Sequence, residues 1–174
     1  MIKYVVLVLS LLSISCNSTK NKVKTASIEE SVEIFCPKDG DCSVSLIKNK
    51  SLSRRNDITG SIYYELTNNL KTAVIKFEYN KKVDTTLQDN HYREEILFEI
   101  PSDFDEIKLE DKELESIKML FGKHCFCKGK AGIYLVEKGK INIKKDEQKI
   151  FFNLEFEVEN TDQKIKKITN SIKI

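Results

Sequence analysis

Alternation of apolar and polar residues runs through most of this chain and constrains its fold more than any other feature. Successive side chains of a β-strand point to opposite faces, so alternation indicates strands that are buried on one face only. The clearest case is the segment FNLEFEV, residues 152–158. One-sided burial favours antiparallel sheets, because parallel sheets are buried on both faces.

The same alternation predicts a series of short strands along nearly the whole chain. Strands are expected at 32–36, 42–46, 62–66, 73–79, 96–100, 132–136, 141–143, 152–158 and 165–174. Turns are expected at 37–41, 68–71, 137–140 and 145–148, and longer polar loops at 49–60 and 80–91. The Lys-rich segment 165–174 suits the edge of a sheet. Strands at this spacing predict an antiparallel β-sandwich or barrel, and the pattern does not choose between these two.

One segment, 112–121, has a helical period instead. Its apolar residues stand three and four positions apart, at Leu114, Ile117, Leu120 and Phe121. Asp111 is the expected N-cap and Gly122 the expected stop. The sequence therefore predicts one short helix in an otherwise β-rich domain.

The N-terminus has the order of features found in a secretory signal. Lys3 precedes an apolar run at 4–12, which is far shorter than the about 20 residues of a membrane span. The segment that follows, Leu12-Ser13-Ile14-Ser15-Cys16, resembles the lipobox of bacterial lipoproteins, although Ser13 stands where an aliphatic residue is usual. The resemblance implies that residues 1–15 are removed and that Cys16 is acylated. The alternative is an ordinary signal peptide followed by a free cysteine.

The expected organisation is a signal peptide at 1–15, a lipidated cysteine with a polar tether at 16–30, and a single β-rich domain at 31–174. Asn17 is not the aspartate that retains some bacterial lipoproteins at the inner membrane. The resemblance therefore implies a bacterial cell-envelope protein, held by lipid in the outer membrane and facing the periplasm. The formal net charge of +2 argues against a nucleic-acid partner.

Four further cysteines, Cys36, Cys42, Cys125 and Cys127, are expected to form two disulfides in this oxidising compartment. Residues two apart in an extended strand have Cα atoms about 6.6 Å apart and parallel side chains. A bond within CFC, residues 125–127, would therefore need a kink. We favour bonds that join the first pair to the second, and the pairing of 36 with 42 and 125 with 127 stays open.

A second interpretation gives the same cysteines a chemical role. His124, Cys125 and Cys127 could contribute to a zinc or copper(I) site, or the two thiols could form a redox pair. The spacing matches no two-pair CxxC site, so we favour the structural interpretation and expect no cofactor. Five glutamates that alternate with apolar residues are expected on solvated sheet faces, namely Glu78, Glu95, Glu99, Glu155 and Glu157.

No catalytic constellation is evident in the sequence. His91 lies near Asp89 and Glu94 in a segment that reads as a polar loop, and neither a nucleophile elbow nor a glycine-rich phosphate loop is present. We therefore expect a non-catalytic binding or interaction module, whose partner is an envelope protein, a glycan or another envelope component. Tyr63, Phe151 and the 80–91 loop are where an exposed apolar or aromatic patch would lie.

Two alternative functions remain open. One is an inhibitor of a lytic enzyme or protease, with 37–41 as the inhibitory loop. The other is a metal or redox module built on His124 and the cysteines.

Overall fold

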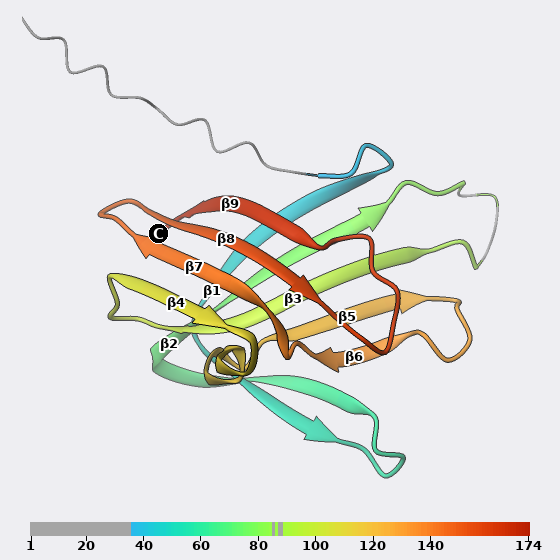
Figure 1. The fold of residues 1–174 in the computed structure, drawn as a ribbon, viewed down its shortest axis with the longest axis horizontal. Coiled ribbons are helices and arrows are strands. Elements are labelled where there is room, and N and C mark those ends of the chain that lie inside the picture. The colour runs from blue at the N-terminus through green and yellow to red at the C-terminus, as the bar shows by residue number, and fades with distance from the viewer. Residues whose placement is uncertain (1–35, 85, 87–88) are drawn as a thin grey trace, which may run out of the picture. The chain divides into compact units, whose positions relative to one another are not determined.

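The computed structural model describes residues 36–84, 86 and 89–174 of the chain. The expected signal segment, Cys16, the tether and most of the expected strand at 32–36 lie outside the described residues. Two antiparallel sheets pack against each other (Figure 1), which confirms the expected mainly β fold and makes it a β-sandwich.

The two sheets contain nine strands within the described residues. The first sheet has the order β1-β2-β3-β5-β6, with the strands β1 (Gly40–Asn56), β2 (Ile62–Lys81), β3 (Tyr92–Pro101), β5 (Leu120–Cys125) and β6 (Gly132–Leu135). The second has the order β4-β7-β8-β9, with β4 (Glu106–Glu110), β7 (Lys138–Lys145), β8 (Lys149–Glu157) and β9 (Lys167–Lys173). β9 is an edge strand, as its lysines predict.

The core lies between the two sheets and consists of the residues that alternation assigns to one face. Phe98 of β3 meets Phe152 of β8 edge to face, with ring centroids 5.6 Å apart. Phe121 of β5 meets Phe156 of β8 at 6.0 Å. All four rings are almost fully buried. The alternation therefore identifies the strand faces that pack in the core.

The hairpin of β1 and β2 is much longer than the sequence predicts. The expected loop at 49–60 is largely strand, and the expected turn at 68–71 lies inside β2. The two strands stay paired through both segments, with a register shift between Lys48 and Lys50. A bulge of this kind bends a strand without ending it. Tertiary pairing thus overrides the polar composition that predicts a loop.

The distal half of this hairpin, residues 50–68, folds back over the outer face of the first sheet. Leu52 of β1 is buried there with Val74, Leu97 and Leu120 in a second apolar cluster. At its end, Ile62 of β2 pairs with Ile133 of β6. The first sheet is therefore covered on both faces, by the second sheet and by its own hairpin.

The expected helix at 112–121 is shorter and of another type. It is a 3₁₀ helix, η1 (Asp111–Ile117), with Glu110 at the N-cap instead of Asp111. Lys118 ends it with a left-handed backbone. Leu114 and Ile117 are three residues apart, and both are buried, which suits the three-residue turn of a 3₁₀ helix.

The rest of the expected helix belongs to β5. Leu120 joins the outer cluster and Phe121 the inner core, so the two point to opposite faces of the sheet as strand neighbours do. Gly122, the expected helix stop, lies within β5. The expected turn at 137–140 is likewise part strand, because β7 begins at Lys138, and β4 was not predicted.

Candidate functional site

The four described cysteines form two disulfides, Cys36–Cys42 and Cys125–Cys127. The favoured pairing between the two segments is wrong, and the reason is strand order. Cys42 of β1 lies opposite Tyr79 of β2, which lies opposite Glu94 of β3, which lies opposite Lys123 of β5. Three strand spacings put the two cysteine segments roughly 14 Å apart. A disulfide bridges Cα atoms within about 7 Å.

The Cys36–Cys42 bond closes the turn at 37–41. The Gly40 amide donates to the Pro37 carbonyl at 3.1 Å, and Tyr79 Oη donates to Asp39 Oδ1 at 2.8 Å. The Asp39 carboxylate also pairs with Lys164. This segment is therefore a tight, pinned turn and not an extended strand of the kind that adds to a partner's sheet. The inhibitor hypothesis, with 37–41 as its rigid loop, stays a prediction.

The chain bends at the Cys125–Cys127 bond, as a disulfide between residues two apart requires. Cys125 is the last residue of β5, and the Cα atoms of the two cysteines lie 5.3 Å apart. Because the bond encloses a single residue, the chain-entropy model assigns it only about 1–2 kcal/mol of stability. The bond lies at the end of β5 and does not connect two strands.

Glu95, expected on a solvated face, is almost completely buried at 1% exposure. His124 Nε2 lies 2.9 Å from its Oε1, Lys76 Nζ lies 3.0 Å from its Oε2, and Tyr64 Oη donates to Oε1 at 3.2 Å. Tyr64 comes from the folded-back half of β2. The burial of Glu95 therefore follows from the folded-back hairpin, which the alternation of residues does not predict.

A glycine makes room for this carboxylate. Gly122 lies opposite Glu95 in the pairing of β3 with β5, and a Cβ there would stand 2.7 Å from Glu95 Cγ. Burial alone would raise the pKa of Glu95, but hydrogen bonds from His124 and Lys76 and their charges outweigh it and lower this pKa to about 2. Glu95 therefore stays ionised in the interior, where it binds Lys76, His124 and Tyr64.

The other predicted site residues are dispersed. His91 is exposed just before β3, and the imidazole of His124 faces Glu95. In the part of the chain that the structure describes, no group of three or more His, Cys, Asp or Glu side chains is placed to hold a metal ion. Glu155 and Glu157 are exposed as expected, whereas Glu78 and Glu99 are partly buried.

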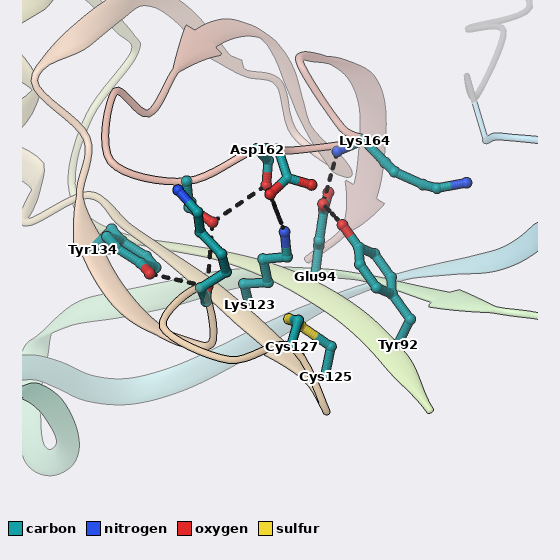
Figure 2. The surroundings of a disulfide bond; sticks show 10 residues. Tyr92, Glu94, Lys123, Cys125, Cys127, Tyr134, Asp162 and Lys164 are labelled. Carbon is teal, nitrogen blue, oxygen red and sulfur yellow. Dashed lines mark hydrogen bonds and ion pairs between the residues drawn. A yellow bond between two sulfur atoms is a disulfide. The ribbon is translucent and has the colours of Figure 1, made fainter. Parts of the chain in front are cut away.

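A second pair of buried charges, Glu94 and Lys123, lies between the sheets at the end of the core (Figure 2). Glu94 accepts the backbone N–H groups of Lys164 and Ile165 at 2.7 and 2.8 Å. Lys123 Nζ donates to the Asp162 carbonyl at 2.9 Å and pairs with its carboxylate at 2.8 Å. The two charges therefore fasten the β8–β9 connection over the core.

A groove of about 600 Å³ lies where the distal half of the hairpin meets η1 and β6. Its apolar lining is aliphatic and consists of Leu52, Met119, Leu120, Leu135 and Val136. Its polar lining carries both signs of charge and consists of Ser53, Arg54, Lys112, Glu115, Lys118 and Glu137. The groove therefore combines an apolar floor with a rim of charged side chains, and its volume lies within the range of ligand-binding sites.

The surface residues singled out by the sequence analysis do not form one patch. Tyr63, at 44% exposure, belongs to β2 of the first sheet, and Phe151 belongs to β8 of the second. The 80–91 loop is described only in part. None of these residues lines the groove among the positions described. Leu135, at 36% exposure, is the most accessible large apolar residue of the groove. In the sequence, only the apolar run at 133–136 pointed to this segment.

Comparison with known proteins gives no match to a family model, to a curated protein or to a solved structure. Among the described residues, no helix combines the length and the apolar character needed to cross a bilayer.

Proposed function

We propose that this chain is a lipid-anchored protein of the bacterial cell envelope whose β-sandwich is a non-catalytic binding module. The anchor is Cys16, at the end of the lipobox-like segment, and the location is the periplasmic face of the outer membrane. Two disulfides in the described domain support an oxidising compartment. The observation that carries the binding function is the aliphatic groove beside the folded-back hairpin.

The groove favours a polypeptide segment over a glycan. A sugar carries hydroxyl groups on most of its carbon atoms, and burying them against leucine, methionine and valine without hydrogen bonds costs free energy. A peptide can place one apolar side chain on this floor and its charged neighbours against the rim. Because the rim contains Arg54 and Lys112 as well as Glu115 and Glu137, the segment that fits best carries charges of both signs.

Replacing Cys16 by alanine tests the anchor. Cys16→Ala removes the sulfur that carries the lipid, and a stable anchor needs more than one acyl chain. We expect the variant to move from the membrane to the soluble fraction and to lose incorporation of labelled palmitate. Ser18→Ala, two residues beyond the cysteine, is the control and should stay in the membrane fraction. Palmitate labelling of Cys16→Ala equal to that of the unaltered protein would refute the anchor.

Replacing Leu135 by arginine tests the groove. Selection of peptides from a displayed library against the full-length protein should enrich segments that combine apolar and charged residues. Leu135→Arg should weaken their binding by about tenfold or more, because a charge then replaces apolar contact on the floor. Leu70→Arg is the matched control, since Leu70 is 81% exposed in β2 and does not line the groove.

Two outcomes contradict the groove. Selected peptides that bind Leu135→Arg and Leu70→Arg equally would place the binding surface elsewhere. A glycan array that yields ligands when the peptide library yields none would replace the polypeptide partner by a sugar.

A further inference from the structure

The Cys125–Cys127 disulfide differs from a structural staple. The bond Cys36–Cys42 ties a residue outside the sheet to β1, whereas Cys125–Cys127 spans a single residue at the end of β5. A crosslink stabilises a fold by restricting the unfolded chain, and the effect grows with the enclosed loop. Stability therefore explains little of why two cysteines stand at these positions.

The backbone around this disulfide is also held by contacts other than the bond itself. Cys125 is paired with Tyr92 in the sheet, and the Lys130 amide donates to the Cys127 carbonyl at 3.1 Å. Beside them, Lys123 is fastened to Asp162 (Figure 2). None of these contacts uses the sulfur atoms. The local fold therefore does not rest on the sulfur–sulfur bond alone.

The disulfide is also accessible and lies in a cationic segment. Both cysteines are partly exposed, and Phe126 between them is 79% exposed. Within 123–130, Lys123 is paired with Asp162 and His124 with Glu95, and Lys128 and Lys130 are the exposed cations that follow the cysteines. Nearby cations favour the thiolate form of a cysteine, which makes it a better leaving group in disulfide exchange.

We propose that Cys125–Cys127 is a thiol–disulfide exchange site that takes two electrons from the dithiol of a partner protein. A partner thiolate attacks Sγ of Cys125, the bond between the two cysteines breaks, and Cys127 leaves as a thiolate beside Lys128. The second partner thiolate then attacks the partner sulfur of the mixed disulfide and releases Cys125. The partner gains a disulfide, and its two protons pass to Cys125 and Cys127. Phe126 provides the apolar contact for the partner.

Glutathione buffers test this site on the full-length native protein. At a series of times after transfer to buffers of different reduced-to-oxidised ratios, free thiols are alkylated and located by peptide mass. We expect Cys125 and Cys127 to be reduced about tenfold or more faster than Cys36 and Cys42, and to reoxidise when oxidised glutathione is restored. Equal rates for the two bonds, or reduction only after denaturant is added, would overturn the proposal.

Two double variants separate an exchange site from a staple. Cys125→Ala/Cys127→Ala should abolish the fast reversible reaction and keep the melting temperature within about 5 °C of the parent protein. Cys36→Ala/Cys42→Ala should retain the fast reaction. Loss of folding in the first variant would show that the bond is structural and would reject the exchange role. The groove experiment is unaffected by either result, because no cysteine lines the groove among the described residues.

Discussion

Glu95→Gln is expected to lower the free energy of unfolding by about 2–3 kcal/mol at pH 7, because it removes the buried charge that faces Lys76 and His124. Lys76 Nζ and His124 Nε2 lie 3.0 Å and 2.9 Å from the carboxylate oxygens that the substitution alters. The amide keeps nearly the same volume, so the loss measures the electrostatic role of the carboxylate. Urea unfolding followed by circular dichroism gives the value.

The same carboxylate predicts how stability depends on pH. The folded protein lowers the pKa of Glu95 from 4.5 to about 2, so the unfolded chain takes up a proton at higher pH than the folded one. The stabilising contribution is therefore complete above pH 4.5 and disappears as the pH falls toward about 2. In Glu95→Gln this part of the pH dependence should be missing, and the difference from the parent protein should shrink across that interval.

A matched glutamate controls for general effects of charge removal. Glu155 of β8 is exposed and pairs with Lys140 at 3.6 Å. Glu155→Gln should change the free energy of unfolding by less than about 1 kcal/mol, because an exposed ion pair contributes little. If Glu95→Gln costs no more than this control, Glu95 is not the charged centre that the geometry indicates.

The strands and their inward faces could largely be predicted from the sequence, because side-chain direction in a strand follows a strict period of two. The same rule also predicts that two charged residues, Glu94 and Lys123, are buried, although their residue types suggest exposure. Glu94 has the parity of the buried residues Ile96 and Phe98, and Lys123 has the parity of Phe121. Parity therefore places both charges on the inward face, where an ionised side chain must have partners. The charge of these two side chains alone predicts solvent exposure, whereas their position within the strand predicts the burial that the structure shows.

Features that depend on the arrangement of distant segments could not be predicted in this way. The disulfide pairing follows from two strands that stand between β1 and β5, and local spacing does not give strand order. The polar residues of 49–56 are strand because β2 pairs with them beyond a bulge. The burial of Glu95 and the groove both require this hairpin to fold back. A sequence that alternates well therefore gives the sheets, but not the surface on which a site is built.

Glu94→Ala is expected to lower the free energy of unfolding by about 3–4 kcal/mol, because it removes a buried charged side chain and its hydrogen bonds. Glu94 is fully buried, and it is the acceptor for the amides of Lys164 and Ile165. Tyr92 also donates its hydroxyl to Glu94. Burial, together with this hydrogen bond and the carboxylate charge, raises the pKa of Tyr92, which keeps the hydroxyl protonated as a donor. Alanine leaves these donors buried without an acceptor.

The damage should be concentrated in the β8–β9 connection, because Glu94 accepts two backbone amides of this connection, those of Lys164 and Ile165. Amide hydrogen exchange at Lys164 and Ile165 should accelerate more than exchange in β3, where Glu94 itself lies. Glu94→Gln keeps one acceptor oxygen and should lose about half as much stability as the alanine variant. Glu157→Ala, which removes an exposed partner of Lys166 at 3.6 Å, is the control and should cost less than about 1 kcal/mol. Uniform acceleration of exchange across both sheets would show that Glu94 supports the core as a whole.

Lys123 fastens the same connection through Asp162. Amide exchange in the β8–β9 connection should therefore accelerate more in Glu94→Ala/Lys123→Met than in either single variant.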